Sequence, residues 1–405
     1  MEVLKKHTIE FLFIFFLTFG YIFFYSLAVP FDSLNTYFSI PFRIVMIFVS
    51  FYIIYINFEN IKRRKLTIIF MVLFWVFYLI KANYSFKNGV FLPKVMKNEY
   101  QVYIRIIFLN LLPYIAVLSI NLSKDIMMKL NSWAFNFLLI IIGISSLYAI
   151  FVTHVFERAS GIFASYYISA GHYGLSLVIL SVFYYFQFPN KMMKPILGIL
   201  LGIFTIFISS ARSPMLAALI LSLIFLIYLN KLKYWVALIS FVIIFIVGIY
   251  YLKQSSLSDF AFVNRMYDGI FRGDGYGRSA NILKGWDIFK SNMLLGGSIL
   301  FEDGSYPHNI FVEVLMSMGI IGFILLCLYF KDLVKFRLTY IKDQLYNLPY
   351  FLFFIQYFIL VVTSYTIFAN MEFWSFAAVA VSIILFCYDE KIKSNDRRGN
   401  TTGNH

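Results

Sequence analysis

Residues suited to acid–base and phosphate chemistry stand at two places where polar sequence meets a long apolar run. The chain has five histidines, and His308 immediately precedes one such run, with Asn309 beside it and Glu313 further in. At the second place, Arg212 follows Ser210 in a short break between two apolar runs. An imidazole can take a proton from a hydroxyl group, and a guanidinium can hold a phosphate through parallel hydrogen bonds. These residue types together suit transfer of a group from a phosphate leaving group.

Each of these residues also has a structural interpretation. Asn309 is a favourable helix cap, and His308 could simply begin the helix. Glu313 would share a helix face with Asn309 rather than with His308. Arg212 could reach toward lipid head groups, although a charged residue at a membrane boundary is also a candidate functional residue. The position of these residues in the whole chain decides between the two interpretations.

The composition requires that most of the chain lie in a membrane. Of 405 residues, 61% are hydrophobic and only 13% are charged, whereas soluble domains carry about 25% charged residues. A crossing helix needs about 20 apolar residues, and about twelve runs approach that length. We therefore predict an all-α fold, a polytopic transmembrane helical bundle of about 12 spans with a large, partly helical extracytoplasmic loop. The predicted spans lie near 9–29, 40–58, 66–83, 102–120, 133–153, 163–188, 195–209, 214–230, 234–252, 308–330, 348–368 and 371–388.

The net charge of +14 follows from the loops on one side of the membrane. If the N-terminus is cytoplasmic, every short loop on that side carries Lys or Arg, while the outer loops near 30–39 and 369–370 carry neither. This asymmetry is typical of the positive-inside rule. It predicts cytoplasmic N- and C-termini and an outer face that holds Arg212 and His308. The charge then needs no nucleic-acid partner, and we expect none.

The span pattern divides the chain into four segments. They are nine transmembrane helices in 1–252, a large extracytoplasmic loop in 253–307, three transmembrane helices in 308–388 and a cytoplasmic polar tail in 389–405. The apolar part of the N-terminal run is longer than that of a signal peptide, so we interpret it as a first span. Cys327 and Cys387 both lie in apolar runs, which favours neither a disulfide nor a metal site.

The large loop contains "FRGDGYGRSANILKGW", which includes Arg272 and Arg278. Its glycines do not form the G-x-x-x-x-G-K-[ST] pattern, and the loop would face away from cytoplasmic ATP. No two histidines or acidic residues in the chain have a spacing typical of metal ligands. We therefore expect neither a metal nor another cofactor.

Three stretches follow one another in the second half of the chain: "SSARSPMLAAL" (209–219), "GRSANILKGWDIFKSNMLLGGS" (277–298) and "HNIFVEVLMSMGIIG" (308–322). In order, spacing and predicted sidedness they resemble the O-antigen polymerase and ligase family of bacterial membrane glycosyltransferases. The resemblance covers 195–330. Three features depart from the family pattern, one of them being Trp286, which lies a few residues later than the family tryptophan. Ser213 and Pro214 replace the usual small pair after the arginine, and Met293 replaces a proline.

The resemblance implies an enzyme that acts on undecaprenyl-diphosphate-linked glycans at the outer face of the bacterial plasma (inner) membrane, without a metal. It implies catalytic roles for Arg212 and Arg278, which hold the diphosphate, and for His308, which activates the acceptor hydroxyl. The residues expected to bind substrate are Arg212, Arg278, Ser210, Asn309 and Glu313.

The family carries out two related reactions. A polymerase moves a growing chain onto a fresh repeat unit, and a ligase moves a finished chain onto lipid A-core or another acceptor. We favour a polymerase of O-antigen or capsular repeat units because the chain is rich in Phe, Tyr, Ile and Lys and shows no domain for a protein acceptor. Expected partners are the lipid-linked glycans, membrane lipids, and flippase and chain-length regulator proteins.

Two other classes of protein agree with the number of predicted spans but do not explain where the charged residues lie. A flippase or transporter would place more charge within its spans, where only Arg43, Arg105 and His172 lie, and would show internal repeats. A scaffold subunit would give no reason for Arg212 and His308. Both remain less favoured alternatives.

Overall fold

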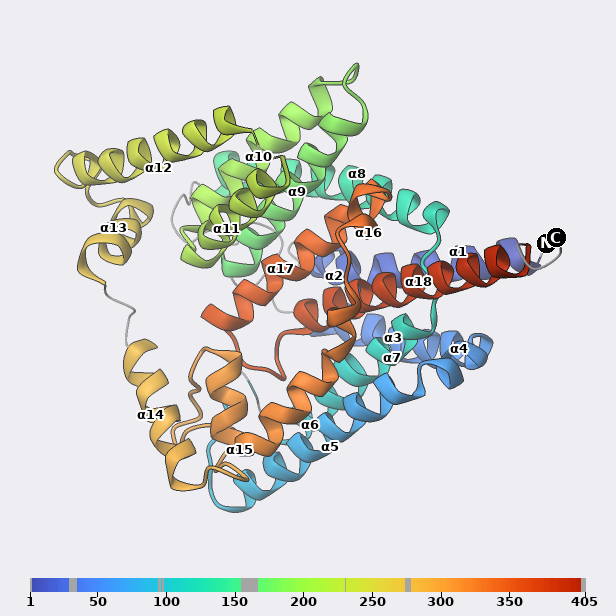
Figure 1. The fold of residues 1–405 in the computed structure, drawn as a ribbon. Helices are drawn as coiled ribbons and strands as arrows, with labels where there is room; N and C mark the ends of the chain where they lie inside the picture. Colours follow the sequence, from blue (N-terminus) through green and yellow to red (C-terminus); the bar gives the residue numbers. More distant parts are fainter. Residues whose placement is uncertain are drawn as a thin grey trace.

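The computed structural model describes residues 2–28, 35–93, 96, 98–153, 167–229, 231–273 and 278–401. Regular structure in these ranges is helical throughout (Figure 1). Ten helices among the described residues are long and apolar enough to cross a membrane, and two further apolar helices are shorter. Together they coincide with the twelve predicted runs, which confirms the all-α polytopic bundle. Residues 30–34 of the predicted outer loop, Gly277 of the second motif and residues 402–405 of the tail lie outside the described residues.

The membrane spans are built from helical elements, some of which continue directly into one another. They are α1 (Glu2–Phe15), η1 (Phe16–Gly20), α2 (Tyr21–Ala28), α3 (Asn35–Ile56), α5 (Lys65–Lys87), α6 (Tyr100–Ile104), η3 (Arg105–Leu111), α7 (Leu112–Ser119), α8 (Lys124–Tyr148), η4 (Ala149–Thr153), α9 (Tyr167–Gln187), α10 (Met193–Ser209), α11 (Arg212–Leu229), α12 (Leu232–Lys253), α15 (Ile310–Tyr329), α17 (Leu348–Thr363) and α18 (Met371–Thr401). Short helices connect them: α4 (Phe58–Arg63), α13 (Ala261–Tyr267), η5 (Asp268–Arg272), α14 (Arg278–Ser291), η6 (Lys331–Lys335), α16 (Thr339–Lys342) and η7 (Leu345–Asn347).

The two ends of the bundle carry different elements. The start of α1, the end of α18 and α4 lie at one end, and α13 and α14 lie at the other (Figure 1). At the first end Arg63 lies 3.9 Å from Asp389. There too, Lys331 and Lys335 lie 3.3 and 2.8 Å from the buried carboxylate of Asp332. We call this the basic end and the opposite one the loop end.

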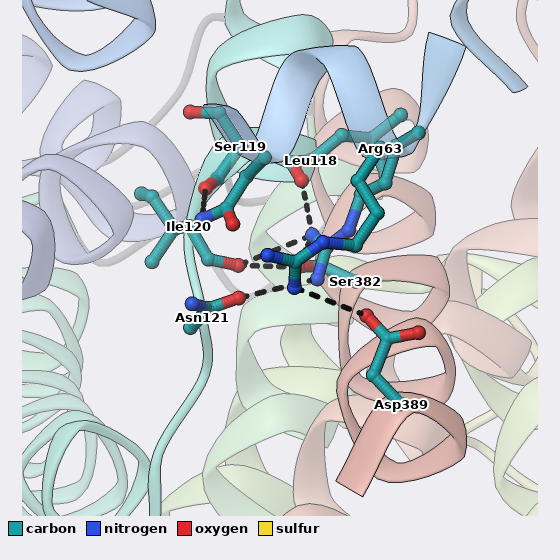
Figure 2. A network of polar contacts seen from close by, with 9 residues as sticks. Arg63, Leu118, Ser119, Ile120, Asn121, Ser382 and Asp389 are labelled. Carbon is teal, nitrogen blue, oxygen red and sulfur yellow. Dashed lines mark hydrogen bonds and ion pairs between the residues drawn. The ribbon is translucent and has the colours of Figure 1, made fainter. Parts of the chain in front are cut away.

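Arg64 ties separate segments together at the basic end. Its guanidinium donates to the carbonyl of Leu118, to that of Ile120 at 3.3 Å and to the hydroxyl of Ser382 at 3.3 Å (Figure 2). A further bond reaches Asn121 Oδ1 at 3.4 Å. Burial lowers the pKa of Arg64 to about 10, so the group is charged at neutral pH. The arginine thereby satisfies carbonyl groups at the end of α7 that have no partner within the helix.

A segment of the large loop packs against a kink in α15. Gly319, in the middle of α15, has φ 63° and ψ −158°, a conformation suited to glycine. The loop backbone fills the break, because Ile320 N donates to Met293 O at 2.8 Å. A Cβ atom on Gly296 would lie 2.6 Å from Gly319 N, so this close approach also requires glycine. The second and third sequence motifs therefore meet here, and their contact fixes the loop relative to α15.

The large loop is partly helical, as predicted, and contains α13, η5 and α14. One detail differs from the sequence expectations. At the C-terminus, α18 continues through the polar tail to Thr401 instead of ending near 388. No proline and no glycine before Gly399 interrupts that tail, so the backbone can extend the apolar helix without a break. Both cysteines are free thiols, in agreement with the sequence analysis.

Candidate functional site

The break between α10 and α11 places Arg212 at the first residue of a helix. Ser210 adopts the left-handed conformation, with φ 50°, and ends α10. Its side chain is buried, and its hydroxyl lies 3.5 Å from Phe207 O within the same turn. Ser210, predicted to bind substrate, therefore forms the turn that positions Arg212.

A hydrogen-bonded contact among three helices holds this turn in place. His172 of α9 lies 3.1 Å from Ser213 of α11, through Nε2 and Oγ. Gln356 of α17 donates from Nε2 to His172 O at 2.7 Å. Pro214 packs so closely on α9 that a Cβ on Gly171 would lie 2.7 Å from the proline ring. Ser213 and Pro214, which depart from the family motif, therefore hold α11 against α9.

Arg265, which the sequence analysis did not select, lies beside Arg212. Arg212 Nε donates to Arg265 O at 2.9 Å. The side chain of Arg265 is only 7% exposed, and its guanidinium lies 5.1 Å from the ring centroid of Tyr167, a favourable cation–π distance. Packing of Phe262 against Ile249 joins α13 to α12 and so carries Arg265 to the site. The available signal was an arginine within the apolar stretch "FAFVNRMY".

Arg278 completes a cluster of three arginines at the loop end. It is the first residue of α14, and its Nη2 donates to Ser364 Oγ at 3.3 Å. Burial lowers the pKa of Arg278, and the positive charges of Arg212 and Arg265 lower it further. Arg212 and Arg278 also stand at helix N-termini, where the helix dipole adds positive potential. A bound anion would relieve this concentration of positive charge.

His308 lies next to the arginine cluster in a strained conformation. Its φ is 60°, and its ring centroid lies 4.3 Å from that of Tyr306. Burial lowers the pKa of His308 to about 4, with a further contribution from the charge of Arg278. The imidazole is therefore neutral at neutral pH. Its Nδ1 atom is buried and has no hydrogen-bond partner among the described residues.

Asn309 caps α15, as the sequence predicts. Its Oδ1 accepts from Phe311 N at 3.0 Å and from Val312 N at 3.2 Å. Its Nδ2 donates to Val362 O at 3.2 Å. The whole side-chain amide is thus engaged in orienting the start of α15, immediately after His308.

Glu313 points away from His308 and holds the segment after α17. The side chain is fully buried, and its Oε1 accepts from Thr366 Oγ1 at 2.6 Å and from Tyr78 OH at 3.3 Å. Its carboxylate also accepts from Ile367 N at 3.1 and 3.2 Å. The segment that Glu313 fixes carries Ser364, the partner of Arg278. No chemical signal in the sequence marks this segment, because it is a loop of small and apolar residues.

The structure therefore brings three of the six predicted site residues together. Arg212, Arg278 and His308 gather at the loop end with Arg265, whereas the other three, Ser210, Asn309 and Glu313, bond mainly to the backbone and side chains that position them. Across the described part of the chain, no group of three or more His, Cys, Asp or Glu is placed to hold a metal ion. The arrangement can bind an anion rich in oxygen and can offer a neutral base beside it.

The fold and this site define a multi-pass helical membrane protein with a half-buried, cationic site at one end of its bundle. Residues 197–327 match the O-antigen ligase family, and the matched range contains the arginine cluster and His308. This match agrees with the resemblance to the O-antigen polymerase and ligase family, and what that family implies is a glycosyltransferase-like enzyme. No curated protein matches the chain significantly.

Proposed function

We propose that this protein polymerises undecaprenyl-diphosphate-linked oligosaccharide repeat units into O-antigen or capsular polysaccharide. The observation that carries the proposal is the convergence of Arg212, Arg265 and Arg278 beside neutral His308. We place the reaction at the outer face of the bacterial plasma membrane, with both termini cytoplasmic. The lysines and arginines at the basic end support this orientation.

The arginine cluster suits a diphosphate leaving group. Negative charge grows on the diphosphate as the bond between its oxygen and the sugar C1 atom breaks. Guanidinium groups that are already fixed in place stabilise that charge without reorganising during the reaction. The donor then needs no metal ion, because the protein supplies the positive charge.

His308 acts as the base in this mechanism. The acceptor hydroxyl oxygen attacks C1 and forms the new glycosidic bond, while its proton passes to a ring nitrogen of His308. The bond from C1 to the diphosphate oxygen breaks, and the diphosphate leaves with the bonding electron pair. Because the charge of Arg278 helps to depress the pKa of His308, a bound diphosphate offsets that charge and strengthens the base. The loaded site is therefore better suited to deprotonate the acceptor than the empty one.

A ligase is the alternative, and the matched family is itself described as O-antigen ligase. The same site could transfer a finished glycan to lipid A-core or another acceptor. Polymerase is favoured by the amino-acid composition of the chain, and in that case flippase and chain-length regulator proteins are expected partners.

The test compares the glycans of cells that make wild type, His308→Ala or Arg212→Ala protein at matched membrane levels. Arg272→Ala is the control, because Arg272 is an exposed arginine paired with Asp268 at 3.3 Å on the same end of the molecule. We expect both site variants to stop at a single repeat unit and the control to make full-length chains. Full-length chains left on the lipid carrier would indicate a ligase. Normal, normally attached chains in both site variants would contradict the assigned site.

A further inference from the structure

A second group of charged residues lies inside the bundle, separate from the arginine cluster. Arg43 lies in α3, Arg105 is the first residue of η3, and Glu372 lies in the first turn of α18. η3 packs against both α3 and α18, and Arg105 is close enough to Glu372 for their charges to interact. With Tyr21 and Tyr173, which contact them, these residues form what we call the inner cluster.

Within the part of the chain that the structure describes, Arg43 of the inner cluster has a hydroxyl partner but no carboxylate partner. Arg43 Nη2 donates to Tyr21 OH at 2.7 Å, while Arg43 Nε is buried without a hydrogen-bond partner among the described residues. Tyr173 OH donates to Glu372 Oε1 at 3.2 Å. Among the described residues of the cluster, two arginines thus accompany one carboxylate, and the hydroxyl of Tyr21, which accepts from Arg43, has no acceptor for its own proton there. An oxyanion would supply both the missing charge and the missing acceptor.

The depth of the inner cluster suits the head of a lipid. Arg43, Arg105 and Tyr173 each lie within about two helical turns of the loop end of their spans. Residues next to both arginines face outward from the bundle; they are Ile44, Val45, Ile104 and Ile107. Each arginine therefore stands at the boundary between the lipid-facing surface and the polar interior. An amphiphile in that leaflet can reach the cluster sideways, with its apolar chain left in the membrane.

α9 separates the two cationic sites. His172 contacts Ser213 beside Arg212, whereas the next residue, Tyr173, contacts Glu372 of the inner cluster. α17 packs against both α11 and α18, which carry residues of the two sites. The segment between α17 and α18 begins with Ser364, the partner of Arg278, and leads directly into Glu372. The two sites are thus distinct but adjoin the same short segment.

We propose that the inner cluster binds the phosphate-bearing head of the second lipid-linked substrate, the acceptor. This inference rests on the proposed function, because it takes the site of Arg212 and Arg278 to hold the donor. A transferase that joins two lipid-linked glycans must hold both carriers in one leaflet at once. The acceptor glycan then extends from the inner cluster over the segment after α17 toward His308. A membrane phospholipid offers the same phosphate chemistry, so the test must separate the two sources.

The experiment counts bound copies of undecaprenyl diphosphate on the purified, full-length protein by native mass spectrometry. We expect two copies on wild type and one copy on Arg43→Gln and on Arg105→Gln. Arg43→Lys keeps the positive charge and should retain two copies, and so should the exposed-arginine control Arg272→Gln. Thermal unfolding of each variant shows whether it is folded. Two copies on both folded Gln variants would overturn the inference.

Two further arms identify the ligand and separate this inference from the proposed function. When phosphatidylglycerol is added in tenfold excess, wild type should still bind two copies of undecaprenyl diphosphate. Loss of the copy that depends on Arg43 would show that the inner cluster is an ordinary phospholipid site, and it would overturn the inference. Arg212→Gln should lose the other copy, and the double variant Arg43→Gln, Arg212→Gln should lose both. If Arg212→Gln alone retained two copies, the proposed donor site would fail while the second phosphate site would stand.

Discussion

Replacing Arg278 by glutamine should raise the pKa of His308. Burial and the positive charge of Arg278 both lower that pKa, from its usual 6.5 to about 4. The Arg278→Gln substitution removes the charge and leaves a shorter, polar side chain. The proton on His308 is then repelled less, and the imidazole binds it at a higher pH.

The size of the expected rise in the pKa of His308 follows from the relative contributions of burial and of the charge of Arg278. Burial is the larger, so Arg278 accounts for less than half of the difference between 6.5 and about 4. We therefore expect the pKa of His308 to rise by about one unit in Arg278→Gln, to about 5, which corresponds to about 1.4 kcal/mol. Adding undecaprenyl diphosphate to wild type should move the pKa in the same direction, because its negative charge offsets that of Arg278.

The assay is an NMR titration of the protein labelled with ¹³C in its histidine rings, with the signal of His308 assigned through His308→Gln. Wild type and Arg272→Gln should titrate at about 4, and Arg278→Gln about one unit higher. Since the neutral imidazole is the base, the acid limb of kcat/KM for wild type should follow the same low pKa. A wild-type midpoint near 6.5, or equal midpoints in wild type and Arg278→Gln, would refute the reasoning.

Three further predictions concern residues that hold the site or the rest of the bundle in place. Glu313→Ala leaves Ile367 N buried without its acceptor and should lower the free energy of unfolding by about 3 kcal/mol or more, measured as a lower thermal unfolding temperature. Glu313→Gln keeps a carbonyl acceptor and should lower the unfolding temperature less. Equal decreases in the two variants would contradict this role. Gly269→Ala places a Cβ 3.2 Å from Arg212 Nε, so donor binding should weaken while the unfolding temperature stays near that of wild type. Arg64→Ala removes the contact of Figure 2 and should lower the unfolding temperature with an unchanged number of lipid diphosphates bound per folded molecule.

Much of the site could be found from sequence because its residues stand out against an apolar background. Arg212 and His308 lie at the ends of apolar runs, where a polar residue is conspicuous. Arg265 was missed because it lies within a short apolar segment of the large loop, whose folding could not be read from periodicity. For Glu313, the sequence predicted only that it lies on a different helix face from His308. Its role in holding the segment after α17 became visible only from its contacts with Thr366 and Ile367.

The sequence by itself determined the class of fold, the positions of the spans and the end of the bundle at which the chemistry is expected. These features depend on local composition, since an apolar run of sufficient length must be helical in a membrane. The tertiary structure alone decided which side chains converge there, because contacts between distant segments leave no local pattern. The meeting of Gly296 with Gly319 and the bond from Arg278 to Ser364 join residues from separate elements. Only the packing of whole helices against one another brings such groups within reach.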